Sequence, residues 1–508
     1  MPRESQSREP AECVRSFGRC AKGISEVKHP TSTDAAKRAL LDAAAARRRV
    51  VIHGGGHSFD GQALHDGDTG QDLVLCTDQL TGIRWPDAQE PQGTVCMSAG
   101  ATWSSFLDDS IRRGRASGRV ELPGTMQTGG GATAGGTLAG DCLSRFSATQ
   151  GKESAWVESF RLITPSGFDG IVSRGADPEL FHAAIGGHGY IGLATDIVYR
   201  LRSIPADSRV TTKISTYTDL PTLVAELKAR SERPRDPEGA VSSAGFTDLT
   251  ERFRFKGAIF ESSYAPVDHA LPGFVLYQDL SSLARYASEL AARIPAMNWA
   301  IHEALFVEAQ DTPTYQNDLR PFLFFMDANT FAKSRYERDH PGRLFPIVQQ
   351  TFVIPDADHA AAFAERTLRL AADAMVRPTE FDILYAKSDR CLMSATYEQA
   401  GFAISIAFEP ETEWQDGCPP AAIAGLLSNL SDICWDEYHG RVHLVKNVHM
   451  SRTTFRKMFN DRGQLDLFEQ IKRQYDPDGV LQNGFSDAFF DFGGPSSPTT
   501  TRRRLAAP

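Results

Sequence analysis

The stretch VVIHGGGHSFDGQ, residues 50–62, runs from a short β-branched segment into three consecutive glycines, a histidine and a serine. A strand that ends in this way presents bare backbone, whose N–H groups can turn toward an anion. Two further glycine stretches follow, PGTMQTGGGATAGGTLAG at 123–140 and AIGGHGYIG at 184–192. Of the 42 glycines in the chain, 15 fall in these three stretches, so we expect loops that hold a ligand.

The glycine stretches do not match the two commonest nucleotide-binding motifs. None contains GxxxxGK[ST], which excludes a P-loop, and no GxGxxG opens a first strand–helix turn with an acidic residue about 20 positions later. The second stretch is also too rich in glycine to predict a regular helix or strand. Three glycine loops in one region therefore predict a long dinucleotide that is held at several points.

The composition is that of a soluble globular enzyme, with 41% hydrophobic and 23% charged residues. The formal net charge of −10 argues against a nucleic-acid partner, which would require a basic surface. The sequence contains no run of about 18 apolar residues, so no membrane span is predicted. No Sec signal peptide is recognisable either. Eight cysteines without metal-ligand spacing predict reduced thiols, no metal site and a cytoplasmic location.

In this order and spacing, the three glycine stretches resemble the FAD-binding domain of the vanillyl-alcohol oxidase and p-cresol methylhydroxylase (PCMH) superfamily. The resemblance covers about residues 30–203, with a return near 440–490. It implies that the first two loops hold the pyrophosphate and ribityl chain of FAD, and that the third stretch lies on the adenine side. The cofactor-binding residues that it implies are Gly54, Gly55, Gly56, His57, Ser58, Gly124, Thr125, Thr128, Gly131, Gly135, Gly136, Asp141, Gly187, Gly192, Ile197 and Asn483.

His57 stands in a GxGHS context. In flavoenzymes of the resembled class, the histidine at this place carries the flavin through a covalent bond to its 8α carbon. The alternative is a histidine that caps the turn and donates a hydrogen bond to a phosphate. The subgroup with two covalent bonds has a cysteine in the second loop, and residues 123–131 contain none, so a single bond is predicted. We expect Cys142 to be a buried, small apolar residue.

Three later segments resemble the substrate side of the decaprenylphosphoryl-ribose oxidase type and, more loosely, of alditol and aldonolactone oxidases. They are QQTFVIP at 349–355, GFAISIAF at 401–408 and GRVHLVKN at 440–447. The resemblance implies that Lys446 lies near the reacting hydroxyl. It also implies that Gln349, Thr351 and Ser405 line the catalytic site. Where that oxidase has further sugar contacts, the sequence offers no clean match, so a sugar-lipid substrate is not predicted.

Lys446 has two nearby rivals as the catalytic base, His443 and His449. If residues 441–446 form a strand, His443 and Lys446 point to opposite sides, and only one of them can face the flavin. Without the resemblance, Lys446 would be read as a solvated lysine at a strand end. The motif DPDGVLQNGF at 476–485 resembles the closing motif of the family, in which Asn483 reaches the flavin edge, although DPDG alone is a common turn.

The sequence thus predicts an α+β oxidoreductase that passes a hydride from an alcohol on a sugar, polyol or natural product to FAD. Desaturation, oxidative cyclisation or C=C reduction on the same fold, and a non-catalytic FAD-binding scaffold, remain alternatives. The electron acceptor is oxygen or unknown, and a homo-oligomer is compatible with the sequence. The predicted parts are a disordered segment (1–25), a two-subdomain PCMH-type FAD-binding domain (26–204), an α+β substrate-binding domain with an antiparallel sheet (205–435), a C-terminal return that completes the flavin site (436–490) and a disordered tail (491–508).

Overall fold

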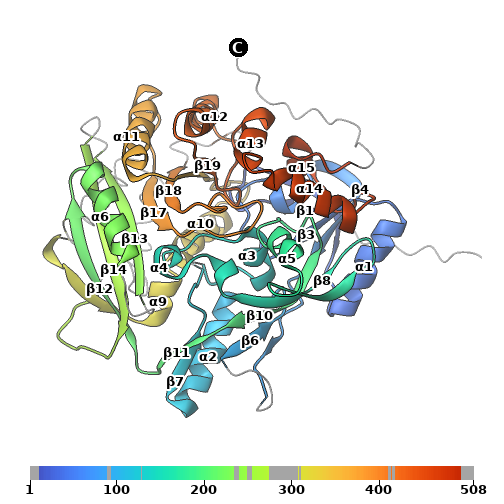
Figure 1. Cartoon of the computed structure of the whole chain (residues 1–508), viewed down its shortest axis with the longest axis horizontal. Helices are drawn as coiled ribbons and strands as arrows, with labels where there is room; N and C mark the ends of the chain where they lie inside the picture. The colour runs from blue at the N-terminus through green and yellow to red at the C-terminus, as the bar shows by residue number, and fades with distance from the viewer. Residues whose placement is uncertain are drawn as a thin grey trace, which may run out of the picture.

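The computed structural model shows a mixed α+β chain whose described residues form three larger sheets, a two-stranded ribbon and the helices around them (Figure 1). None of the described helices is long and apolar enough to cross a membrane. The residues that the structure describes are 11–87, 93–127, 129–233, 239–248, 254–273, 307, 310–409, 414 and 418–493.

The first sheet has the order β1-β2-β4-β3, and both β2 and β3 run parallel to β4. The helix α1 (Thr33–Ala45) connects β2 to β3 and begins at Ser32, whose side chain accepts a hydrogen bond from the Ala35 amide. This helix agrees with the Ala-rich run in the sequence. The strands are β1 (Ala11–Arg15), β2 (Lys22–Lys28), β3 (Val50–His53) and β4 (Gly67–Cys76).

The prediction of a disordered segment over residues 1–25 is wrong for residues 11–25. These residues form β1 and the first part of β2, which pair with each other, and β2 also pairs with β4. The Arg- and Ser-rich composition gave no sign of strands, because their stability comes from pairing with a distant partner rather than from an apolar run. Residues 1–10 and residues 494–508 of the predicted tail lie outside the described residues.

The second sheet has the order β5-β6-β10-β8-β9 and is antiparallel throughout, and a separate ribbon pairs β7 with β11. One expectation fails here, because part of the second glycine stretch is helical. The helix α3 begins after Thr133, whose hydroxyl accepts from the Gly136 amide. The strands are β5 (Ile83–Arg84), β6 (Thr94–Met97), β7 (Arg119–Leu122), β8 (Val157–Ile163), β9 (Asp169–Ser173), β10 (Leu193–Arg200) and β11 (Arg202–Pro205), and the helices are α2 (Trp103–Ser117), α3 (Ala134–Gly140), α4 (Ser147–Gln150), α5 (Pro178–Ala184) and η2 (Glu153–Ala155).

The third sheet is antiparallel and has eight strands in the order β15-β12-β14-β13-β17-β18-β16-β19. The helices α6, α11 and α12 contact its strands (Figure 1). The strands are β12 (Arg209–Tyr217), β13 (Gly239–Asp248), β14 (Arg254–Ala265), β15 (Thr314–Asn317), β16 (Val348–Ile354), β17 (Glu380–Ala386), β18 (Gly401–Phe408) and β19 (Arg441–Val442), and the helices of this part are α6 (Leu220–Glu232), α9 (Leu319–Leu323), α10 (Asp327–Asp339), α11 (Ala357–Asp373) and α12 (Ala421–Asp436).

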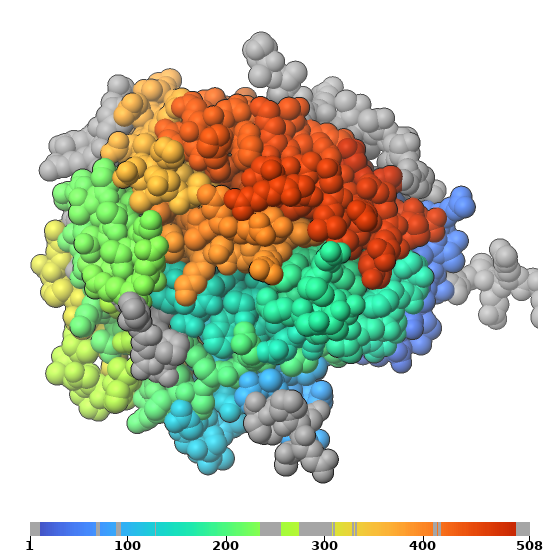
Figure 2. Space-filling view, viewed as in Figure 1, coloured from blue at the N-terminus to red at the C-terminus, as the bar shows by residue number. Residues whose placement is uncertain are grey.

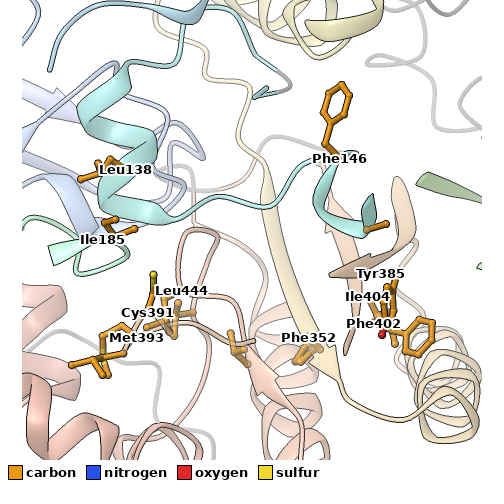
Figure 3. Packing of buried hydrophobic residues seen from close by; sticks show 14 of the residues in the cluster. Leu138, Phe146, Ile185, Phe352, Tyr385, Cys391, Met393, Phe402, Ile404 and Leu444 are labelled. Atoms are coloured by element: carbon orange, nitrogen blue, oxygen red, sulfur yellow. The ribbon is translucent and has the colours of Figure 1, made fainter. Parts of the chain in front are cut away.

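The two faces of this sheet differ in what they contact. On β16, Phe352 lies against Phe363 of α11, with ring centroids 5.2 Å apart, so that face is covered by helices. The other face packs against the N-terminal half of the chain, since Ala407 clusters with Phe59, which follows the first glycine loop. Residues that are distant in the sequence, among them Leu138, Ile185, Phe352 and Ile404, belong to one buried cluster (Figure 3). The face opposite α11 is therefore the one turned toward the glycine loops.

The C-terminal segment returns to the first sheet. The Val50 amide donates to the Val480 carbonyl at 2.8 Å, and Val50 pairs with Leu481. In Figures 1 and 2 this red segment lies against the blue N-terminal part and the teal part that contains α5. The helices here are α13 (Arg452–Phe459), α14 (Gln464–Tyr475) and α15 (Gly484–Phe489), with η1 (Gly61–Ala63) facing α15.

Candidate functional site

The first and second glycine loops lie directly against each other. The Gly55 amide donates to the Thr133 hydroxyl at 3.2 Å. A Cβ atom placed on Gly54 would lie 2.8 Å from that hydroxyl, and one on Gly55 would lie 2.7 Å from the Gly131 carbonyl oxygen. Any side chain at these positions would force the loops apart. The two stretches predicted to share one ligand are therefore neighbours in space.

His57 lies where these two loops meet. A Cβ atom on Gly131 would be 3.2 Å from its Cε1 atom, and the Phe17 ring stacks on the imidazole with centroids 5.5 Å apart. Its Nδ1 is buried and has no hydrogen-bond partner among the described residues. Burial lowers the pKa of His57, against smaller opposing effects of the Gly55 backbone and of Asp327, so the neutral form of the ring is favoured. A neutral imidazole with an unused ring nitrogen is chemically suited to form a bond.

The remaining predicted residues of the second loop have packing roles that their sequence positions did not reveal. Gly124 packs on the Trp156 indole, since a Cβ atom would lie 1.9 Å from Cζ2. The Thr125 hydroxyl donates to the Gly151 carbonyl at 2.8 Å. Gly135 and Gly136 fit against Ala99 and Gly54, so they allow the close approach of the loops. Thr128 lies outside the described residues.

The third glycine stretch is shaped by packing within the protein. A Cβ atom on Gly187 would lie 2.3 Å from the Ala183 carbonyl oxygen, and one on Gly192 would lie 2.7 Å from that of Ile163. Ile197 is fully buried in β10 opposite Met97. Gly187, Gly192 and Ile197 could therefore contact a ligand only through their backbone groups.

Asp141 was expected to contact the cofactor, but its carboxylate is used within the protein. It accepts from the Ser154 amide at 2.9 Å and pairs with Lys152 at 2.6 Å. Lys152 also pairs with Asp389 at 2.9 Å and donates to the Ser394 hydroxyl at 2.6 Å. This buried triad joins the end of α3 to the segment after β17. The Asp141 carboxylate thus serves as a structural ion-pair partner, and its contact with the cofactor stays a prediction.

Asn483 also has a structural role, and its contact with the flavin edge stays a prediction. Its Nδ2 donates to the carbonyls of Gly61, Gln62 and Leu64 at 2.8–3.1 Å. Its Oδ1 accepts from the Tyr190 hydroxyl and the Ser486 amide, both at 3.0 Å. These contacts use the whole hydrogen-bonding capacity of the amide. Asn483 thus holds the segment that follows the first glycine loop.

The segment that carries Lys446 is not the strand that the sequence predicted. β19 ends at Val442, and residues 443–447 continue beside β16 as a loop, with the His443 amide donating to the Thr351 carbonyl and the Asn447 amide to the Gln349 carbonyl, each at 2.8 Å. The argument from side-chain alternation therefore does not apply to His443 and Lys446. It failed because only the first two residues of the run keep a regular strand register.

Lys446 is held in place by the sequence motif around His57. Gln62 Nε2 donates to the Leu444 and Lys446 carbonyls at 2.9 and 2.7 Å, and the Lys446 ammonium lies 3.9 Å from the centroid of the Phe59 ring. Lys446 makes no ion pair with any described residue. Burial lowers its pKa, which increases the fraction of neutral amine. A lysine in this setting can exchange a proton with a bound hydroxyl.

The two rival histidines have other surroundings. His443 is buried, and burial lowers its pKa well below the usual value, so it stays neutral. The backbone of His449 binds the Gln350 side chain at 2.7 Å and the Ser431 hydroxyl at 2.8 Å. Gln350 points toward α12, on the far side of β16 from Thr351. Of the three candidate bases, Lys446 is the one in contact with the first glycine loop.

Gln349, Thr351 and Ser405 come together on the face of the third sheet that is opposite α11. Thr351 pairs directly with Ser405, and their hydroxyls lie 2.8 Å apart. Gln349, two residues before Thr351, lies on the same face, and its Oε1 is buried without a partner among the described residues. The predicted substrate-side residues thus form one polar row.

Four residues of this region were not singled out from the sequence: Phe17, Gln62, Asp327 and Asp382. Phe17 lay in the segment predicted as disordered, and Asp327 reaches the second loop from α10, where its carboxylate accepts from the Gly130 amide at 2.8 Å. Gln62 was visible in the motif HSFDGQ. Asp382 stands in EFDILYA, where acidic and apolar residues alternate, and this pattern could have indicated a polar sheet face.

Comparison with known proteins is consistent with this arrangement. Residues 25–168 match the FAD binding domain family. An uncharacterized oxidoreductase from the fasciation locus of Rhodococcoides fascians is 29% identical over 187 residues, which are 36% of this chain and 39% of that relative. The match thus spans about two fifths of the length of the relative. The range similar to the FAD binding domain family contains both facing glycine loops and His57, and the chain has the expected α+β architecture.

Proposed function

We propose that the protein is an FAD-dependent oxidoreductase that oxidises an alcohol group of a sugar, polyol or natural product. The observation that carries this proposal is the position of Lys446, an amine without an ion-pair partner among the described residues, against the motif of the FAD-binding domain. The similarity to an oxidoreductase supports the same class of reaction. A protein that only stored FAD would have no use for a desolvated lysine at this place.

The residues of the site fit FAD. The facing loops offer backbone with no room for side chains, and the buried Nδ1 of His57 is unused. When bound, FAD supplies a two-electron acceptor that takes a hydride from the carbinol carbon. Lys446 accepts or shares the hydroxyl proton at its Nζ atom, while Thr351 and Ser405 orient the hydroxyl-bearing substrate. Burial of Lys446 favours this role because it lowers the cost of holding a neutral amine.

The test of this function is anaerobic bleaching of the flavin by a panel of alcohols. The purified protein should contain FAD, and at least one sugar or polyol should bleach the flavin absorbance roughly in proportion to bound flavin. Product analysis should then show a carbonyl in place of the hydroxyl. A carbon–carbon double bond or a new ring in the product would instead support desaturation or cyclisation. A flavoprotein that no alcohol bleaches would contradict the proposal.

We further propose that Nδ1 of His57 forms a single covalent bond to the flavin 8α carbon. The bond would replace one 8α C–H bond and the imidazole N–H bond, and the two electrons released would pass through the flavin to the electron acceptor of the enzyme. Acid precipitation of the wild-type protein should leave the yellow colour in the pellet, whereas His57→Ala should release all of its FAD into the supernatant. His53→Ala is the matched control. His53 is the last residue of β3, directly before the first glycine loop, and its Nδ1 is hydrogen-bonded to the Ala63 carbonyl at 2.8 Å. Colour that leaves the wild-type pellet would show that no such bond exists.

A further inference from the structure

Asp382 extends the polar row of the third sheet onto a third strand. It lies on β17 directly opposite Ser405 of β18, which in turn lies opposite Thr351 of β16. Directly opposed residues in antiparallel strands point to the same face, so the three side chains share one face. The neighbours of Asp382 along β17, Phe381 and Ile383, are buried in the apolar core on the other face. The carboxyl group of Asp382 therefore lies on the polar face of β17, whereas the opposite face of the strand packs in the apolar core.

Two acceptor atoms in this row lack donors. Asp382 Oδ1 and Gln349 Oε1 are both buried, and neither has a hydrogen-bond partner among the described residues. Gln349 as a whole is only 7% exposed. A buried acceptor without a donor is costly, and folded proteins pair nearly all such atoms. Two unpaired acceptors on one face, beside Lys446, indicate that a bound molecule supplies the donors.

The charges around this row limit what that molecule can be. Glu380 and Asp382 both act electrostatically on Lys446, so two carboxyl groups and one ammonium share the region. Burial, and then Glu380, raises the pKa of Asp382 to about 7. An anionic group would be repelled by the carboxyl groups and the two oxygen acceptors, and a cationic group would be repelled by the Lys446 ammonium. An uncharged group with several O–H donors satisfies the acceptors and avoids both repulsions.

We propose that Asp382, together with Gln349, determines specificity by accepting hydrogen bonds from hydroxyl groups of an uncharged polyol or sugar, and that it disfavours phosphorylated substrates. This inference rests on the proposed alcohol oxidation, since it concerns the same site. It adds a residue from β17 that touches the substrate away from the reacting carbon. It also separates free polyols from phosphorylated ones, which the proposed reaction alone does not do.

The test measures binding rather than turnover. Sorbitol, sorbitol 6-phosphate and 1-amino-1-deoxysorbitol are titrated into the holoprotein, and Kd is obtained from the flavin difference spectrum. Wild type should bind sorbitol at least about tenfold more tightly than either charged analogue. Asp382→Leu should weaken sorbitol binding about 10- to 100-fold, as expected for loss of a hydrogen bond to a buried carboxyl group. It should also reduce the ratio between the Kd of sorbitol 6-phosphate and the Kd of sorbitol.

Two further variants separate specificity from folding. Asp382→Asn keeps the size and one acceptor oxygen, so it should bind sorbitol within about threefold of wild type. Asp373→Leu changes an exposed aspartate at the end of α11 and should leave all three Kd values unchanged. Sorbitol that binds without bleaching the flavin would refute the oxidation but not this inference. Equal or tighter binding of the phosphate by wild type, no spectral change with sorbitol, or unchanged binding in Asp382→Leu with normal flavin content would overturn the inference.

Discussion

Lys446→Met lowers kcat by about 10²- to 10⁴-fold with a bleaching alcohol, the range that removal of a general acid or base usually produces. Methionine has nearly the length of lysine and can pack on Phe59 in the same way, but it cannot exchange a proton. Flavin content should stay normal, because Gln62 holds the Lys446 backbone and the methionine side chain can still pack on Phe59. Stopped-flow measurement of anaerobic flavin reduction gives the rate directly.

Lys446→Arg distinguishes two roles of the lysine. If Lys446 acts as a neutral base, reduction becomes faster as pH rises through its lowered pKa, and the Lys446→Arg variant shows neither this rise nor significant activity, because arginine stays protonated. If the positive charge alone matters, arginine should retain much of the rate. Lys457→Met, which changes an exposed lysine paired with Asp436, is the control. A normal reduction rate in Lys446→Met would exclude any catalytic role for this residue.

Lys152→Met should destabilise the folded protein by about 3–5 kcal/mol, the usual cost of removing one partner from a buried ion pair. The Lys152 side chain is 2% exposed and neutralises Asp141 and Asp389, so its loss leaves two buried carboxylates without a counter-charge. The free energy of unfolding is measured by urea titration at saturating FAD, so that cofactor binding contributes equally to each variant.

A second substitution tests whether the lost counter-charge is the cause. Asp389→Asn in the Lys152→Met background removes one of the stranded charges and should restore part of the stability. Lys387→Met is the matched control, since Lys387 is exposed and its ammonium donates to the Thr149 carbonyl rather than to a carboxylate. Interaction with Lys152 lowers the pKa of Asp389 despite its burial, so its contribution to stability is present above the unfolded pKa and is lost as pH falls through the folded value. Equal stability of wild type and Lys152→Met would show that the triad contributes nothing.

Local features of the fold could be predicted from the sequence, because they depend on nearby residues. The β-branched run before the first glycine stretch was expected to be a strand, and Val50–His53 forms β3. The helix Arg452–Phe459 likewise depends on a nearby residue, because the Ser451 side chain caps it by accepting from the Thr454 amide. The strands β1 and β2 were missed because they become stable only by pairing with β4, and no apolar run marks them.

The candidate site shows the same limit more sharply. The resemblance gave the positions of Asp141 and Asn483 but not their partners. Asp141 pairs with the nearby Lys152, which also binds the distant Asp389, and Asn483 binds the distant Gly61. Hydrogen-bonding capacity is a property of a residue, whereas its use is decided by what the fold brings beside it. The membership of Asp382 in the polar row likewise depends on the register of β17 against β18, which the sequence of one strand does not contain.

The hold of Asn483 on the backbone at Gly61, Gln62 and Leu64 has a consequence for biosynthesis. A nascent chain that has emerged through residue 168 already contains both facing glycine loops, but the amide that fixes the end of the first loop lies 422 residues after Gly61. The bridge from Val50 to Leu481 is completed just as late. Domains usually fold from the N-terminus during synthesis. Here we expect FAD to be incorporated only after nearly the whole polypeptide has been translated.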